Sequence, residues 1–238
     1  MAQRPWHDIP IDPSNEPLVP LPAALLRLEP HPYAALGAPY GPGQSPFALR
    51  RSVVARLLQA QVELQRSCPE LRLAVFDGWR PIAVQQFMVT HTLAELCAQQ
   101  GVDRGVASAE RAWLEAEVGR FWAPPSHDPA TPPPHSTGAA VDLTLATADG
   151  QPLDMGGAID AIGAMSEPEH YSGAALADPT STAAQWHRRR QWLSAAMAAA
   201  GFAQHPNEWW HYSWGDQLWA WRSGAPQACY GAIAPEAA

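Results

Sequence analysis

The sequence has few cysteines, no secretory leader pattern and no long apolar segment. Its three cysteines, Cys68, Cys97 and Cys229, are an odd number without paired spacing, which indicates free thiols in a reducing compartment. The first residues, MAQRPWHDIPIDPSNEP, contain no apolar core of the kind that secretory signals have. No apolar run approaches the roughly 18 residues that a membrane span needs. We therefore expect a cytoplasmic protein without a membrane partner.

Basic residues are also scarce. The chain has 15 lysines and arginines against 23 aspartates and glutamates, for a formal net charge of −8. Because phosphate backbones are bound by clustered positive side chains, this balance argues against a nucleic-acid partner. The single basic run, residues 188–190, falls in a predicted helix, and we expect it on a solvated face.

The composition is otherwise that of a globular protein. With 238 residues and 47% hydrophobic content, the chain can bury a substantial core. No repeat and no clear linker interrupts it, so we expect one domain over residues 1–238. Residues 1–44 are predicted to wrap over the core in extended form, and residues 215–238 to form a C-terminal tail. The oligomeric state stays open.

Hydrophobic periodicity predicts helices alternating irregularly with strands. The first helix is predicted to begin with Ser45 as its cap and Pro46 at its first position, with an apolar face of Val53, Val54, Leu57, Leu58 and Val62. Further helices are predicted over 81–99, 108–122 and 182–200, strands over 71–77, 139–146 and 207–214, and a surface loop over 154–178. This irregular order favours an α+β fold, with a central and mostly antiparallel sheet flanked by helices.

A proline-rich loop runs into the second of these strands and carries a histidine and an aspartate. In PPPHSTGAAVDLTL, His135 and Asp142 are seven residues apart, on either side of Gly138. Residues seven apart on one regular strand point to opposite faces. Both can therefore reach one metal ion only if His135 lies in the loop and Gly138 lets the backbone turn. The alternative is a rigid loop with incidental polar residues.

The stretch EWWHY supplies two more candidates, Glu208 and His211. They also diverge on a regular strand, so we expect Glu208 at the strand entry, after Pro206 and Asn207. Two histidines and a carboxylate, His135, His211 and Asp142, form a catalytic zinc set with a fourth position for water. Glu208 would then be the general base. The alternative is an aromatic strand, partly in the core, with a glutamate at its end.

An arginine in DGWRP completes the set. Arg80 follows a predicted buried strand, and Asp77, Gly78 and Pro81 form a tight turn around it. A cation at such a place can stabilise the oxyanion that develops on an attacked carbonyl. Taken on its own, Arg80 is more typical of a turn arginine that pairs with a nearby carboxylate.

The three motifs DGWRP, HSTGAAVDLTL and EWWHY, in this order, resemble those of the D-alanyl-D-alanine dipeptidases of the VanX type. These enzymes belong to the wider zinc D,D-peptidase and Hedgehog-like fold group. The resemblance covers roughly residues 30–214. It implies this fold, one Zn²⁺ per chain, and a small D,D-dipeptide as substrate.

By position, His135, Asp142 and His211 resemble the zinc ligands of the family, Glu208 its catalytic base and Arg80 its transition-state arginine. Two weaker matches add substrate-binding residues. MGGAID resembles the family pattern in which Asp160 would hold the free amino group of the substrate, and PYAALGAPYG resembles one in which Tyr33 would line the same pocket.

Two departures affect the expected substrate preference. Pro133 stands where the family has a serine two residues before the histidine, and GAPYG replaces a polar D-N-F-x-G segment. We therefore keep a D,D-carboxypeptidase or peptidoglycan endopeptidase with the same zinc site as an alternative. A non-catalytic zinc-binding module is a further one, although it predicts the loss of Glu208 or Arg80.

Overall fold

The computed structural model describes residues 4–233 of the chain. Its strands are β1 (Leu18–Pro20), β2 (Leu26–Arg27), β3 (Ala48–Arg50), β4 (Leu71–Asp77), β5 (Ala140–Thr147), β6 (Ala203–Gln204) and β7 (His211–Ser213). Its helices are α1 (Pro32–Ala35), α2 (Arg51–Ser67), α3 (Ile82–Gln100), α4 (Ala109–Phe121), α5 (Ser172–Ala177), α6 (Thr182–Ala199) and α7 (Gln217–Ser223), with 3₁₀ turns η1 (Pro134–Thr137) and η2 (Ala164–Ser166).

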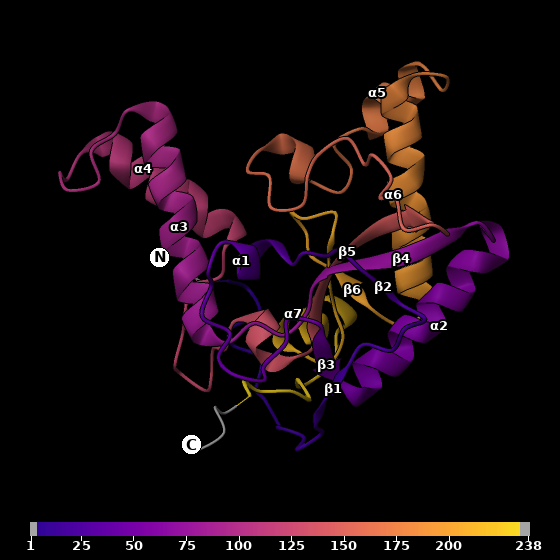
Figure 1. Cartoon of the computed structure of the whole chain (residues 1–238), viewed down its shortest axis with the longest axis horizontal. Helices are drawn as coiled ribbons and strands as arrows, with labels where there is room; N and C mark the ends of the chain where they lie inside the picture. The colour runs from indigo at the N-terminus through magenta and orange to yellow at the C-terminus, as the bar shows by residue number, and fades with distance from the viewer. Residues whose placement is uncertain (1–3, 234–238) are drawn as a thin grey trace.

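Five strands form the central sheet in the order β2-β4-β5-β7-β6. The β2–β4 pair is parallel, and the other three pairs are antiparallel. Strands β1 and β3 form a separate antiparallel pair. Helices α2 and α6 lie on one side of the central strands, and α3 and α4 on the other (Figure 1). The predicted α+β architecture with a mostly antiparallel sheet is confirmed.

Two apolar clusters flank the sheet. The larger one joins α2 and α6 to the central strands, where Leu57, Leu193 and Leu143 are completely buried. The smaller one includes Val84 of α3 and Val118 of α4. The ends of β4, β5 and β7 hold the buried polar residues described below.

The first predicted helix is wrong at its beginning. Helix α2 begins at Arg51 rather than at Ser45 or Pro46, because residues 48–50 form β3 and pair with β1. The Ser45 hydroxyl accepts the backbone N–H of Phe47 instead, which makes a local turn. Strand pairing therefore overrides a helix-start signal that is local.

Val62 was also assigned to the wrong face of this helix. Its side chain is 53% exposed, because at 3.6 residues per turn it lies about 140° around the helix from Leu57. Gln61 and Leu64 take the inward positions of this last part of α2.

The basic run holds a second correction. Arg190 is 2% exposed rather than solvated. Its guanidinium donates to the carbonyl oxygens of Met155, Met165 and Glu167 at 2.8–2.9 Å. These carbonyls belong to the segment 154–178, which was predicted as a surface loop and which contains η2 and α5. Arg190 therefore anchors this segment to α6.

The predicted strands over 71–77 and 139–146 agree with β4 and β5 within one residue, whereas the strand predicted over 207–214 is reduced to β7, and the predicted extended segment 1–44 contains the short helix α1. Helices α3, α4 and α6 match the predicted spans, and α3 ends at Gly101 in the left-handed conformation. The segment predicted as a C-terminal tail contains α7, whose cap Asp216 accepts the N–H of Trp219. Cys68, Cys97 and Cys229 are free thiols. Within residues 4–233, every helix is too short or too polar to span a bilayer.

Candidate active site

Three adjacent strands bring polar side chains to one place. Asp142 of β5 lies directly across from Asp77 of β4 and from His211 of β7. Cross-strand neighbours project from the same face of a sheet. The strand register therefore gathers two carboxylates and an imidazole, although they are distant in the sequence.

His135 joins this row from the preceding loop. It lies in the 3₁₀ turn η1 (Pro134–Thr137), which is capped at its C-terminal end by Gly138. Gly138 has φ +72°, and a Cβ there would come within 2.5 Å of Leu18 Cδ2. Glycine is thus required both by the left-handed backbone and by the close packing. The prediction of a loop histidine and a glycine bend before the strand is confirmed.

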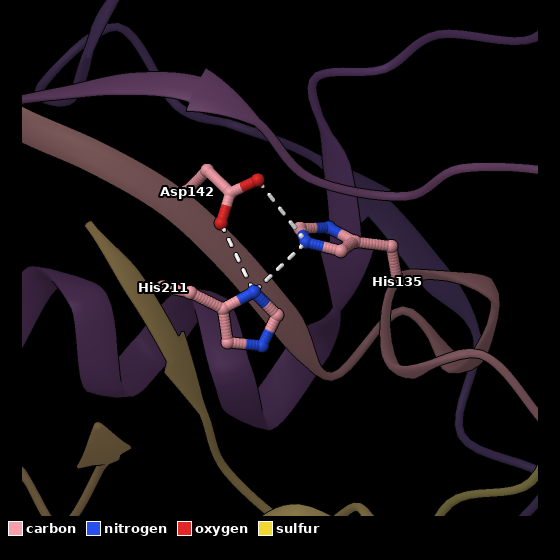
Figure 2. Close-up of side chains that lie close together, drawn as sticks. All are labelled: His135, Asp142 and His211. Atoms are coloured by element: carbon pink, nitrogen blue, oxygen red, sulfur yellow. Dashed lines mark hydrogen bonds and ion pairs between the residues drawn. The ribbon is translucent and has the colours of Figure 1, made fainter. Parts of the chain in front are cut away.

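Figure 2 shows the side chains of His135, Asp142 and His211 converging. Nε2 of His135 lies 3.2 Å from Nδ1 of His211 and 3.2 Å from Oδ2 of Asp142. Nδ1 of His211 lies 3.1 Å from Oδ1 of Asp142. All three residues are buried, and their donor atoms are close enough to hold one metal ion.

Hydrogen bonds and charge set the protonation of this cluster. Nδ1 of His135 donates to the carbonyl oxygen of Gly78 at 2.8 Å, which leaves Nε2 as the ring nitrogen available to bind a metal. Nε2 of His211 lies 3.3 Å from the hydroxyl of Ser213. Burial alone would raise the pKa of Asp142, but the imidazoles of His135 and His211 hold it well below its usual range. Asp142 is therefore a carboxylate.

Arg80 lies directly behind this cluster. Its Nη2 is 2.7 Å from Oδ2 of Asp77 and 3.5 Å from Oδ2 of Asp142, and its Nη1 donates to Gln85 at 2.9 Å. Burial would lower the pKa of Arg80, but Tyr33 and Asp77 hold it well above its usual value. Arg80 is thus a permanent cation. It pairs with a carboxylate, as a turn arginine would, and it also lines the site.

Glu208 lies three residues before β7, at the predicted strand entry. Its Oε2 is 3.6 Å from Nδ1 of His211, and its Oε1 is 3.5 Å from Nδ1 of His205. Burial raises the pKa of Glu208 well above its usual value, and the charge of Asp142 raises it further. A carboxyl with a raised pKa is suited to accept a proton and pass it on.

Asp160 lines the same pocket as these residues and contacts Tyr33. The Tyr33 hydroxyl donates to Oδ2 of Asp160 at 2.5 Å. Asp160 has a positive φ of 64°, which is uncommon for a residue other than glycine. Burial and the charge of Asp142 raise the pKa of Asp160 to about 7.

One pocket opens onto most of these side chains. Its wall consists of Arg4, Arg80, Gln85, Phe121, Trp122, Ala123, Pro134, His135, Asp142, Asp160, His205, Glu208, Trp210 and His211. The site residues predicted from the sequence are therefore brought together, with one difference. Among the described residues, Tyr33 does not line this pocket, but its hydroxyl donates to Asp160, which does.

The sequence motifs did not identify every residue of the pocket. His205 could have been found from the sequence, because it lies three residues before Glu208 in HPNEWWH. Gln85 lies one helical turn into α3 and was hidden by the apolar pattern of that helix. Arg4 had no signal, because it comes from the far N-terminal segment.

Comparison with known proteins identifies the family. The family described as D-ala-D-ala dipeptidase matches residues 27–228. The chain belongs to the D-Ala-D-Ala dipeptidase family. It is 47% identical over 226 residues to a D-alanyl-D-alanine dipeptidase of Synechocystis sp., covering 92% of this chain and 90% of that protein. It is 40% identical over 78 residues to a D-alanyl-D-alanine dipeptidase of Escherichia coli, covering 33% of this chain and 36% of that protein.

Among solved structures, the chain is similar to a mutant of the vancomycin resistance D,D-pentapeptidase VanY in complex with Zn(II). The TM-score is 0.44 and the sequence identity is 16%, with 76% of this chain and 81% of that chain covered.

The donor set of this family member fits a tetrahedral divalent metal. Zinc bonds of about 2.0–2.2 Å to nitrogen and oxygen place two ligand atoms about 3.3 Å apart. The three donor separations here are 3.1–3.2 Å. Oδ1 of Asp142 is also buried, and although Nδ1 of His211 is 3.1 Å away, it accepts no well-aligned hydrogen bond from the described residues. A cation would satisfy this carboxylate oxygen, and the pocket leaves room for a fourth ligand.

Proposed function

We propose that this protein is a zinc-dependent dipeptidase that hydrolyses D-alanyl-D-alanine, or a related small D,D-dipeptide, to free amino acids. The observation that carries the proposal is the shared pocket. The buried set His135, Asp142 and His211 opens into the same space as Glu208 and Arg80. Membership in the D-Ala-D-Ala dipeptidase family supports the substrate class.

His135, Asp142 and His211 would hold one Zn²⁺. When bound there, zinc would lower the pKa of a water molecule and polarise the scissile carbonyl. The residues behind the ligands support this role. Gly78 and Ser213 contact the outer nitrogens of the two histidines and fix the orientation of the rings.

Glu208 is the general base and then the general acid. It takes a proton from the attacking water and returns the proton to the nitrogen of the leaving amino acid. Its burial supports this sequence, because a carboxyl with a raised pKa holds the proton between the two steps.

Arg80 stabilises the negative charge that develops on the carbonyl oxygen. Asp77 and Gln85 hold the guanidinium in one orientation, so little reorganisation is needed as the charge forms. By comparison with other oxyanion donors, its loss costs about 3 kcal/mol of transition-state stabilisation.

Asp160 binds the free amino group of the substrate, and Tyr33 holds Asp160 in place through its hydroxyl. A carboxylate at this end of the pocket favours substrates with a free amino terminus. This preference separates a dipeptidase from an endopeptidase or carboxypeptidase, which must accept a blocked residue there.

The function is tested with a panel of D,D, L,D and L,L dipeptides and a peptidoglycan pentapeptide. We expect hydrolysis of D-Ala-D-Ala, its loss after chelation, and its recovery when zinc is restored. Cleavage of the pentapeptide without cleavage of D-Ala-D-Ala would favour the carboxypeptidase alternative. Activity that chelation does not affect, in protein without bound metal, would refute the zinc assignment.

A further inference from the structure

Two side chains in the wall of the pocket have no role in the proposed chemistry. Arg4 and His205 both line the pocket, next to Glu208. Neither belongs to the ligand set, and neither contacts Asp160 through a hydrogen bond or ion pair within residues 4–233. They place a cation and a hydrogen-bond donor in a part of the pocket that the mechanism leaves without a function.

The segment that carries Arg4 is fixed to the C-terminal part of the chain. The Gln217 amide donates to the carbonyl oxygen of Ile9 at 2.6 Å. Trp6 is 4% exposed, and its ring packs edge-on against His205 with the ring centroids 5.6 Å apart. The Arg4 guanidinium lies over Trp6, 5.4 Å from the ring centroid. Arg4 is thus held at the pocket by packing.

The charges of the pocket are divided between two ends. Arg80 and Tyr33 surround the Asp160 carboxylate. Arg4 belongs to the other end, because it lies over Trp6, whose ring packs against His205, and Nδ1 of His205 is 3.5 Å from Oε1 of Glu208. Burial lowers the pKa of Arg4, and the Glu208 carboxylate opposes this shift. Asp160 can therefore pair with the ammonium group of a zwitterion, and Arg4 can pair with its carboxylate.

His205 adds a directed donor beside Arg4. Its Nδ1 accepts the backbone N–H of Asn207 at 3.3 Å. A neutral imidazole that accepts at Nδ1 carries its proton on Nε2. His205 therefore offers an Nε2–H group.

The chemistry of a dipeptide determines what must lie beside Glu208. In the substrate, the leaving nitrogen and the terminal carboxylate are attached to the same α-carbon. The group that protonates this nitrogen is therefore within a few bond lengths of the carboxylate. Two carboxylates repel each other at such a distance unless a cation lies between them or beside them. A guanidinium matches a carboxylate with two parallel hydrogen bonds.

We propose that Arg4 and the Nε2–H group of His205 bind the C-terminal carboxylate of the dipeptide. This inference rests on the proposed function and extends it from the reacting bond to the length of the substrate. Asp160 binds the amino end and Arg4 the carboxyl end, so the pocket selects for a chain of two residues. A longer peptide would place an amide where Arg4 requires a charge.

The test compares D-Ala-D-Ala with its C-terminal amide, which keeps the scissile bond and loses the negative charge. In the Arg4→Ala enzyme, we expect kcat/KM for the dipeptide to fall about 10- to 100-fold, the usual effect of losing a hydrogen bond to a charged group. For the amide, kcat/KM should change by less than about threefold, because no charged contact is lost. Arg4→Lys should restore part of the loss, and His205→Leu should lower the dipeptide value alone by about 3- to 10-fold.

Arg66→Ala serves as the matched control, because it removes one positive charge from the exposed face of α2, where Arg66 pairs with Glu63. It should leave both substrates unchanged, and zinc content is measured for every variant. An equal fall for dipeptide and amide in Arg4→Ala and His205→Leu would assign them a structural role and overturn the inference. If the wild-type enzyme hydrolyses neither substrate, the proposed function fails and this inference with it. Hydrolysis of the dipeptide with an unchanged acid-to-amide ratio in Arg4→Ala refutes only this inference.

Discussion

The two faces of strand β5 have the same backbone and opposite chemistry. On one face, Val141, Leu143 and Leu145 are completely buried in the apolar cluster with α2 and α6. On the other face, here called the site face, Asp142 carries its charge between two imidazoles and Arg80. Because successive residues of a strand alternate between faces, one eight-residue element serves both the core and the site.

The difference lies in what burial does to each face. Burial of the apolar side chains stabilises the fold directly, by roughly 1.5–3 kcal/mol for each large side chain. Beside the site face, burial of the neighbouring carboxyls Glu208 and Asp160 disfavours their charged forms, which raises their pKa values, whereas His135 and His211 keep the pKa of Asp142 low. The apolar face thus supports a site face that costs stability until a cation and a substrate are bound.

The largest effect is expected on the site face, from Glu208→Gln. Because the variant cannot accept a proton, kcat for D-Ala-D-Ala should fall about 10³-fold or more. Zinc content and the free energy of unfolding should not decrease, since Glu208 is not in the ligand set. Kinetics, metal analysis and urea denaturation measure the three quantities. The control Glu95→Gln changes a 59% exposed side chain on α3, and a kcat within tenfold of wild type for Glu208→Gln would exclude the base.

On the apolar face, Leu143→Ala should lower the free energy of unfolding by about 2–5 kcal/mol, because it leaves a cavity in the core. Urea denaturation of the metal-free protein measures this loss. Leu176→Ala, at a side chain that is 85% exposed, should stay within about 0.5 kcal/mol. If Leu143→Ala cost less than the exposed control, the division between the two faces would be wrong.

Gly138→Ala tests the junction between the faces. Its positive φ alone should cost about 1–2 kcal/mol of stability, and the contact with Leu18 should also displace η1 and weaken metal binding. Gly150→Ala has the same kind of backbone, with φ +88° and nothing within 4 Å of the new Cβ. It should lose stability without losing metal affinity, as measured by competition with a chromogenic chelator. Equal metal affinities in the two variants would contradict the role of Gly138.

The last prediction is a pH dependence of stability in metal-free protein. The folded pKa of Asp160 is about 7, above the ordinary value of 3.8. Between these values the folded state holds a proton that the unfolded state has lost, so stability falls as pH rises from about 4 to about 7. Asp160→Asn removes this dependence, and its stability relative to wild type should increase over that range and then level off.

The control for this experiment is Asp178→Asn. Hydrogen bonds from Thr180 lower the pKa of Asp178, so its charged form stabilises the fold above its ordinary pKa. This variant should lose stability relative to wild type as pH rises, the reverse of Asp160→Asn. Chemical denaturation at several pH values in the presence of a chelator distinguishes the two slopes, and parallel slopes would contradict the assignment.

Elements held by contacts between neighbouring residues could be predicted from the sequence, and elements held by contacts between distant residues could not. Helix α4 could be placed from its cap Ser108, because the capping hydrogen bond to Arg111 is local. The start of α2 could not, since residues 48–50 are held in strand form by β1, thirty residues away in the chain. The burial of Arg190 was likewise hidden, because its three carbonyl partners lie in a segment without periodicity.

The sequence by itself determined the chemistry available to this protein. The motifs contain the proposed metal ligands His135, Asp142 and His211 and the proposed base Glu208, and Gly138 indicates the bend between loop and strand. Only the tertiary structure decided which side chains share the pocket with them. The strand register places Asp142 opposite Asp77 and His211, and the N-terminal segment brings Arg4 into the same pocket as Glu208. These contacts depend on packing between distant parts of the chain, which leaves no local pattern in the sequence.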